Sequence, residues 1–186
     1  MKIENSARLS YQLMTIDDAQ LLFDLDQDPE VLRYIPGADV PSMQDIYDVS
    51  VPRMQSYTNE AEGWGLWKVT TLSGNSGENA DKSRFIGWVL VRPMDFFSDT
   101  PKLDDLELGW RFKRDSWGKG YATEAALSIK TALIAKGNIK RLSSIALEDN
   151  AASVSIMKKL GLNYIKTETH KDPLFESEVV FYHLDV

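Results

Sequence analysis

Apolar residues recur at every fourth position in the second half of the chain, at Tyr121, Ala125, Ile129 and Leu133. This spacing places them on one face of a helix, which we expect over residues 120–136. Gly137 follows the last periodic residue, as is typical of a helix C-terminal cap. Upstream, residues 104–112 alternate or run apolar, so the sequence predicts a strand directly before this helix.

The other expected elements are separated by turn-forming residues. Further strands are expected over residues 8–13, 64–72, 85–91, 141–147, 162–169 and 179–184. Further helical segments are expected over residues 19–25, 31–35, 42–57 and 150–160. Pro52 would kink the long N-terminal segment or divide it into two pieces. The resulting order, βααβββαβαββ, predicts an α/β (α+β) protein with a mixed sheet of about seven strands.

Two of the expected helix starts carry a capping pattern. Thr15 stands three residues before Asp18, which takes the place of the usual Glu or Gln in a capping box. Ser42 stands in the same relation to Asp45. Residues 73–83 are rich in Gly, Ser and Asn, so we expect a long, mobile hairpin loop between two strands there.

The junction between strand 104–112 and helix 120–136 contains Gly118 and Gly120. Glycines let the backbone turn sharply and approach a ligand closely, because no Cβ intervenes. The first N–H groups of the following helix lack partners and carry the positive end of its dipole. Such a place binds phosphate or pyrophosphate, and Lys119 could add a point charge.

Composition sets broad limits on the protein. Its 186 residues, 43% of them hydrophobic, favour one globular domain over residues 1–186. The chain has no cysteine, which excludes disulfides, thiolate nucleophiles and thiolate metal ligands. His170 and His183 have no ligand-like neighbours in sequence, so we expect no metal site. The N-terminal residues lack the apolar segment of a signal peptide, and no apolar run is long enough to span a membrane. We therefore expect a cytoplasmic protein without membrane association.

The formal net charge is −7, with 28 acidic against 21 basic residues. A nucleic-acid groove normally needs a basic face, so this balance argues against nucleic acid as a partner. It permits a cationic acceptor such as an amine, although an ordinary solvated surface explains the charge equally well.

At residues 117–122 the chain resembles the GNAT superfamily of N-acetyltransferases, whose pyrophosphate loop reads Gln/Arg-x-x-Gly-x-Gly/Ala. Gly120 and Ala122 stand at the small positions, while Trp117 replaces the usual Gln or Arg. That replacement and the residues that follow are similar to the branch that contains the ribosomal-protein N-terminal acetyltransferases. The resemblance covers nearly the whole element order and implies a mostly antiparallel sheet flanked by helices, with acetyl-CoA as acyl donor. The implied pyrophosphate-binding residues are Trp117, Gly118, Lys119, Gly120, Tyr121 and Ala122.

A second segment, residues 148–162, resembles the other half of the family signature, Asn-x-x-Ser before a helix that ends Lys-Leu-Gly-Phe. Asn150 at a helix N-cap can bond its own helix or offer its amide to a ligand, and Ser153 lies about one turn later. The resemblance implies that Asn150 contacts the pantetheine arm and that Ser153 lies near the thioester sulfur. A purely local capping pair is the alternative, which the glycine loop upstream makes the weaker one.

Acetyl transfer to an amine needs a general base, because an amine is protonated at neutral pH. Glu107 lies on the strand before the glycine loop, where this family often places its base. Both of its neighbours are leucines, so Glu107 faces the other side of the sheet, and a solvated strand residue is the alternative interpretation. By resemblance, the backbone of Gly109, Trp110 and Arg111 would bind the thioester and pantetheine, with the Trp110 N–H as an oxyanion donor.

Other residues could share the chemistry. Asp172, Glu168 and Asp105 are further candidate carboxylates for the base. Many GNAT enzymes place a tyrosine seven residues after the Asn to protonate the leaving thiolate, but here that position is Met157. Ser153 is therefore the better hydrogen-bond donor to the thiolate. Positioning of two bound reactants can itself supply much of the reduction in the barrier.

The sequence says little about the acceptor, which we expect to be a small-molecule amine or a peptide N-terminus. Trp64 and Trp67 lie in segments that could line its site, although core packing explains Trp67 equally well. The adjacent Phe96 and Phe97 lie in a polar loop, so we expect them to pack onto a ligand or partner. Ribosomal-protein termini, other peptides, polyamines and amino sugars all stay open.

Two other classes of protein fit parts of the sequence. Residues 118–123 resemble the G-x-G-x-x-G of dinucleotide-binding oxidoreductases, but the third glycine is absent and the loop lies past mid-chain. A non-catalytic GNAT-like module could bind acetyl-CoA as a sensor, and the missing tyrosine keeps this alternative open. The presence of Glu107 and Ser153 favours the enzyme. A homodimer, paired through exposed strand edges near the C-terminus, is a further expectation.

Overall fold

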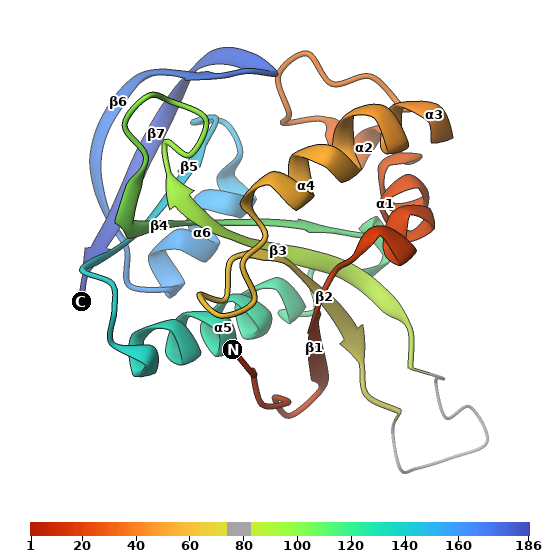
Figure 1. Ribbon diagram of the computed structural model, residues 1–186, viewed down its shortest axis with the longest axis horizontal. Helices are drawn as coiled ribbons and strands as arrows, with labels where there is room; N and C mark the ends of the chain where they lie inside the picture. Colours follow the sequence, from red (N-terminus) through yellow and green to blue (C-terminus); the bar gives the residue numbers. More distant parts are fainter. Residues whose placement is uncertain (74–82) are drawn as a thin grey trace.

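A seven-stranded sheet runs through the described part of the protein in the order β1-β2-β3-β4-β5-β7-β6 (Figure 1). The computed structural model describes residues 1–73 and 83–186, so most of the expected loop over 73–83 lies outside the described residues. Strands β4 and β5 are parallel, and the other neighbouring pairs are antiparallel. The strands are β1 Leu9–Leu13, β2 Gly65–Thr71, β3 Phe85–Met94, β4 Lys102–Phe112, β5 Arg141–Ala146, β6 Asn163–Asp172 and β7 Phe175–Asp185.

Helices cover both faces of the sheet, with α5 and α6 on one face and the N-terminal helices on the other (Figure 1). The α-helices are α1 Ala19–Asp26, α2 Pro29–Leu32, α3 Met43–Asp45, α4 Val51–Tyr57, α5 Tyr121–Lys136 and α6 Ala151–Lys159. Short helical turns are η1 Ile16–Asp18, η2 Ile46–Ser50 and η3 Arg114–Ser116. Within residues 1–73 and 83–186, no helix is long and apolar enough to cross a membrane. The layered arrangement confirms the expected fold class.

Each face of the sheet has its own apolar core. Beneath α5, the predicted stripe of Ala125, Ile129 and Leu133 is fully buried in the larger cluster. The second cluster lies under the N-terminal helices and includes Ile46 and Met54. Each strand contributes side chains to both cores, because successive side chains along a strand point to opposite faces of the sheet.

The predicted caps are present. Thr15 and Ser42 each form a capping box, with Asp18 and Asp45 respectively. Gly137 ends α5 in the left-handed conformation, at φ 75°. Side chains that satisfy the end N–H groups thus set the helix starts, as the sequence predicts.

The chain passes Pro52 without leaving the helical region. The expected helix over 42–57 divides into α3, a π-helical turn and α4, with Pro52 in the first turn of α4. Proline has no backbone N–H to donate. It is tolerated in the first turn of α4 because the N–H groups of a first turn have no acceptor within their own helix.

The last two strands are longer than expected. β6 continues to Asp172 and β7 begins at Phe175, so the two form one tight hairpin closed by that pair. Most β6 side chains are exposed because the strand lies at the sheet edge. The length of β6 is set by its backbone pairing to β7 and not by an apolar pattern. The hydrophobic pattern of the sequence therefore does not reveal the turn between the two strands.

Candidate active-site cleft

The two central parallel strands part in the middle of the sheet. Register pairs between β4 and β5 run from Asp105–Arg141 to Glu107–Ser143. Beyond them, β4 continues to Phe112 while β5 leads toward α6. The Ser144 hydroxyl donates to the Leu108 carbonyl at 2.7 Å, just past the last register pair. The divergence leaves strand backbone available to a ligand between the two strands.

A cleft of about 640 Å³ occupies this opening. Its lining includes the N-terminus of α5, the parted strands and the segment around α2. Of the site residues predicted from the sequence, it is lined by Glu107, Gly109, Trp110, Arg111, Trp117, Gly118, Gly120, Tyr121, Ala122, Asn150 and Ser153. Lys119 is the one predicted residue outside this lining; its side chain is exposed. One hollow therefore brings together segments more than forty residues apart in sequence.

The glycine loop forms one wall of the cleft. Gly118 and Gly120 have φ of 72° and 78°, left-handed conformations that favour glycine. Gly120 is the N-cap of α5 and has no side chain with which to cap it. The first-turn N–H groups are thus available to an anion at the positive end of a 16-residue helix. This geometry fits a diphosphate.

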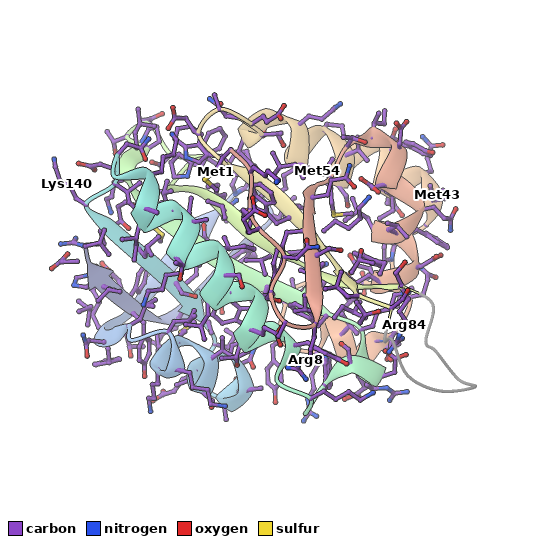
Figure 2. All side chains as sticks on the ribbon, turned by 90° about the horizontal axis from the view of Figure 1, so that it is seen from below. Met1, Arg8, Met43, Met54, Arg84 and Lys140 are labelled. Atoms are coloured by element: carbon purple, nitrogen blue, oxygen red, sulfur yellow. The ribbon has the colours of Figure 1, made fainter. Side chains whose placement is uncertain are left out.

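An N-terminal arginine supports this loop from outside the cleft, and no local pattern in the sequence indicates this role. The Arg8 guanidinium donates to the Lys119 carbonyl at 3.0 Å and to the Glu124 carboxylate at 2.7 Å. Its guanidinium carbon also lies 4.5 Å from the centre of the Tyr121 ring. Figure 2 shows Arg8 beside the N-terminal end of α5. The contact joins the residue just before β1 to the glycine loop across more than one hundred residues.

Asn150 and Ser153 form the local capping pair of the alternative interpretation. The Asn150 Oδ1 accepts from the Ser153 backbone N–H at 3.1 Å and caps α6. The Ser153 hydroxyl in turn accepts from the Trp110 indole at 3.3 Å. Both residues also line the cleft, so the cap does not remove them from ligand contact.

Glu107 lies in the cleft within a buried chain of charges. Arg92 donates to its carboxylate at 2.7 Å, and Arg92 also lies 3.6 Å from Asp172. Asp172 is bonded to Arg53 at 2.5 Å. The chain links β4 and β3 to the β6–β7 hairpin and α4. Glu107 is thus a buried, paired carboxylate rather than the solvated strand residue of the alternative interpretation.

The other candidate carboxylates are held elsewhere. Asp105 is buried against the Ser143 hydroxyl at 2.7 Å, and burial raises the pKa of its carboxyl. Glu168 is exposed beside Lys166. Met157 is fully buried in the core, so this position offers nothing to the leaving group. Among the candidate carboxylates, Glu107 is the one that lines the cleft.

The expectation for the aromatic pair was wrong. Phe96 and Phe97 pack edge-to-face on each other at 5.1 Å and on Tyr57 at 5.9 and 6.3 Å. They close the second core rather than presenting a ligand surface. Trp64 and Trp67 belong to the larger core. The tryptophan missed by sequence reasoning is Trp88, which lines the cleft on the face opposite the larger core.

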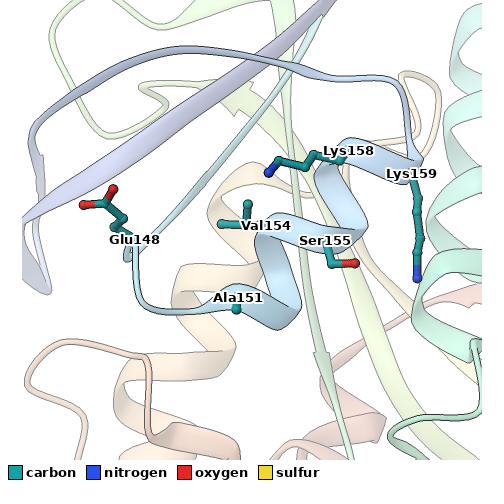
Figure 3. A pocket seen from close by; sticks show the side chains of 6 residues that line it. All are labelled: Glu148, Ala151, Val154, Ser155, Lys158 and Lys159. Carbon is teal, nitrogen blue, oxygen red and sulfur yellow. The ribbon is translucent and has the colours of Figure 1, made fainter.

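A shallower hollow of about 500 Å³ adjoins the cleft along α6 (Figure 3). Its lining includes Glu148, Lys158 and Lys159, and the two lysine side chains diverge from the helix. Ser155 and Lys159 line both hollows. Within residues 1–73 and 83–186, no group of three or more His, Asp or Glu side chains is placed to hold a metal ion.

Comparison with known proteins agrees with this geometry. Residues 8–163 match the acetyltransferase (GNAT) domain. The chain is 25% identical over 170 residues to the FsC-acetyl coenzyme A-N(2)-transacetylase of Aspergillus fumigatus, covering 90% of this chain and 67% of that protein.

Solved structures share the fold. A GNAT-family acetyltransferase from Bacillus anthracis superposes with a TM-score of 0.72 at 21% identity, covering 100% of this chain and 98% of that one. The ribosomal L7/L12 alpha-N-protein acetyltransferase RimL, in complex with coenzyme A, has a TM-score of 0.73 at 12% identity, with the same coverage of 100% and 98%. Together with the domain match, the parted strands and the glycine loop confirm the resemblance drawn from the sequence: the chain belongs to the GNAT acetyltransferase family, and is an acetyl-CoA-dependent N-acetyltransferase.

Proposed function

We propose that this protein transfers the acetyl group of acetyl-CoA to a primary amine by direct attack within the cleft, with Glu107 as proton acceptor. One observation carries the proposal: a single hollow contains the glycine loop, the parted backbone of β4 and a buried carboxylate. Acetyl transfer from acetyl-CoA needs a binding site for the diphosphate, a hydrogen-bond donor to the oxyanion and a general base. The glycine loop, the β4 backbone and the buried carboxylate can supply these in turn.

The donor's diphosphate is assigned to the N-terminus of α5. Gly118 and Gly120 let the backbone approach the phosphates, and the helix dipole favours their charge. The pantetheine arm then runs between β4 and β5, where the backbone of Gly109 to Arg111 and the side chain of Asn150 line the cleft. The Trp110 N–H stays our candidate for the oxyanion donor.

The acceptor is assigned to the other end, beside Glu107. A carboxylate oxygen has more than one lone-pair direction, so Glu107 can hold Arg92 and still accept from an ammonium or a water. The amine loses a proton to Glu107, directly or through water, and its nitrogen bonds to the thioester carbonyl carbon. The C–S bond then breaks and the nitrogen loses its second proton to solvent water, which gives the N-acetyl amide and the coenzyme A thiolate.

The leaving thiolate is assigned to Ser153. Its hydroxyl lies in the cleft and is oriented by the Trp110 indole. A hydroxyl donates a hydrogen bond to a thiolate but is a weak acid, so the thiolate takes its proton from Glu107 or solvent. Most of the rate enhancement then comes from the positioning of two bound reactants.

The family match favours this catalytic role over a non-catalytic acetyl-CoA sensor. The relatives' names mention an N(2) position and the alpha-N position of a ribosomal protein, and we keep both a small-molecule amine and a peptide N-terminus as candidate acceptors. A single domain over residues 1–186, a cytoplasmic location, a homodimer, and the absence of nucleic-acid and membrane partners stay predictions.

Calorimetric titration of acetyl-CoA, together with free-thiol release against a panel of amines and peptides, tests the proposal. We expect binding of acetyl-CoA and thiol release that depends on an acceptor. Binding without release from any acceptor would instead support the sensor, and no binding would remove the basis of the diphosphate assignment.

A further inference from the structure

The floor of the acceptor end is built from three register pairs of β3 and β4. Residues directly opposite one another in an antiparallel pair share a face of the sheet. The pairs are Trp88–Arg111, Leu90–Gly109 and Arg92–Glu107, and all six residues line the cleft. This floor therefore carries an aromatic ring, an aliphatic side chain and two arginines, with Glu107 as its carboxylate.

The walls of the cleft on the N-terminal-helix face of the sheet are mainly apolar. The segment from α2 contributes Val31, Tyr34, Ile35 and Pro36, and β7 contributes Phe175. Apolar surface removed from water stabilises a complex by about 25 cal/mol per Å², so these walls favour a ligand with an apolar body.

The charges at this end neutralise each other. Arg92 is bonded to Glu107 and lies 3.6 Å from Asp172. Arg111 is bonded to Asp26 at 2.6 Å and lies over the Trp88 ring at 5.1 Å. The carboxylates of Glu107, Asp172 and Asp26 thus each have a guanidinium as ion-pair partner.

The carboxylate on the rim is paired as well. Glu30, the other acidic residue that lines the cleft, lies 3.6 Å from Arg33. A ligand with several ammonium groups needs a carboxylate for each charge that it brings out of water, because burial of an unpaired ion is strongly unfavourable. Glu107 can take one ammonium, and the described lining holds no other buried carboxylate for a second. Glu30 lies at the exposed rim, where its contact with Arg33 is weak and solvent screens its charge.

We propose that the acceptor is a primary amine with one positive charge and an apolar or aromatic body, not a polycation. This rests on the transferase function proposed above and names its substrate class. The overall charge of −7 attracts cations to the surface, but salt screens that field beyond about 8 Å and it supplies no partner inside the cleft.

Hexylamine and 1,6-diaminohexane make a matched pair, since they share a chain length and differ by one ammonium group. We would measure kcat/KM for each by thiol release at saturating acetyl-CoA, with spermidine and kanamycin as larger polycations. We expect hexylamine to exceed the diamine by about tenfold, counted per reactive amine. A diamine, spermidine or kanamycin that equals or exceeds hexylamine overturns the inference.

A dipeptide substrate distinguishes a peptide N-terminus from a free small-molecule amine as the acceptor. An Ala-Leu amide carries one charge on its N-terminus and an apolar body, and its rate relative to hexylamine separates a peptide terminus from a free amine. Absence of thiol release with every acceptor would overturn the transferase proposal itself, whereas release that favours polycations would overturn this inference alone.

A variant that introduces a negative charge adds an independent test. Ile35→Glu places an unpaired carboxylate on the half-buried wall of the acceptor end. We expect it to shift the hexylamine-to-diamine ratio toward the diamine by at least about fivefold. Ile134→Glu, on the exposed side of α5, makes the same change of residue and charge away from the cleft and should leave the ratio unchanged. Equal ratios in the wild type and a folded Ile35→Glu protein contradict the inference.

Discussion

Glu107 reaches the cleft already bonded to Arg92, whose Nε donates to the Glu107 Oε2 over 2.7 Å. The two residues stand opposite each other in the β3–β4 register, and both side chains are 8% exposed. Burial alone would lower the pKa of the Arg92 guanidinium, but the carboxylates of Glu107 and Asp172 outweigh it and raise the pKa. Arg92 is therefore a fixed, charged partner that holds the Glu107 carboxylate in one position.

Glu107→Gln removes a proton acceptor while keeping the shape of the side chain. We expect kcat to fall by about 100-fold, because general-base catalysis by a positioned side chain contributes roughly that much. The calorimetric Kd for acetyl-CoA should stay within about twofold, since Glu107 lies at the acceptor end.

Glu168→Gln is the matched control, because it makes the same substitution on an exposed edge strand. Its kcat should equal that of the wild type. A larger loss in Glu168→Gln than in Glu107→Gln would move the base to the edge hairpin and contradict the assignment of Glu107.

Gly120→Ala tests the glycine loop. A Cβ at φ 78° is strained by about 1–2 kcal/mol and would stand 3.6 Å from the Arg8 guanidinium, at the helix start where the diphosphate is assigned. We expect the Kd for coenzyme A, measured by calorimetry, to rise at least about fivefold.

Gly137→Ala provides the comparison at the other end of the same helix. Its φ is 75° and a Cβ there would meet open space, so the backbone strain is similar and the cleft is remote. Both variants should lose similar thermal stability, but only Gly120→Ala should lose affinity. Equal losses of affinity would mean that helix stability, not the loop, controls binding.

Glu124 gives the protein an acid-sensitive contact beneath the loop. Burial raises the pKa of its carboxyl, but hydrogen bonds from Ser6 and Arg8 outweigh burial, so the pKa in the folded protein is lowered. Because the folded pKa is below the unfolded one, the stabilisation is present above the unfolded pKa and is lost as pH falls through the folded pKa.

Glu124→Gln should therefore be less stable than the wild type at pH 7, by roughly 0.5–1 kcal/mol after allowance for solvent screening. The difference should shrink as the pH is lowered from about 5 through the ordinary glutamate pKa of about 4.3, because the unfolded carboxyl then takes up its proton before the folded one does. Urea unfolding at a series of pH values measures it. A constant difference over this range would show that the charge of Glu124 contributes nothing.

Much of the frame could be predicted because its signals are local. The stripe of Ala125, Ile129 and Leu133 sets helix α5, and Gly118 with Gly120 marks the turn before it. Each signal lies within one or two turns of chain, where periodicity and turn chemistry act.

The features that were missed depend on contacts between distant segments. Arg8 supports a loop 111 residues away, and the partner of Glu107 is Arg92 on the neighbouring strand. The hydrophobic periodicity of the sequence does not indicate which charged side chains pair after folding. Phe96 and Phe97 were misjudged for the same reason, since their polar surroundings in sequence hide the buried Tyr57 that they contact.

Asn150 has two roles that one pair of substitutions can separate. Its Oδ1 caps α6 through the Ser153 N–H, and its amide nitrogen is assigned to the pantetheine arm. Asn150→Asp keeps the capping oxygen and removes the amide donor, whereas Asn150→Ala removes both. We expect the Asp variant to retain the wild-type Tm and the Ala variant to lose about 1 kcal/mol of stability, the usual value of an N-cap. Both variants should raise the KM for acetyl-CoA, by about three- to tenfold for one lost hydrogen bond. An Asp variant with wild-type KM would reduce Asn150 to a helix cap, because the oxygen that it keeps would then account for its whole contribution.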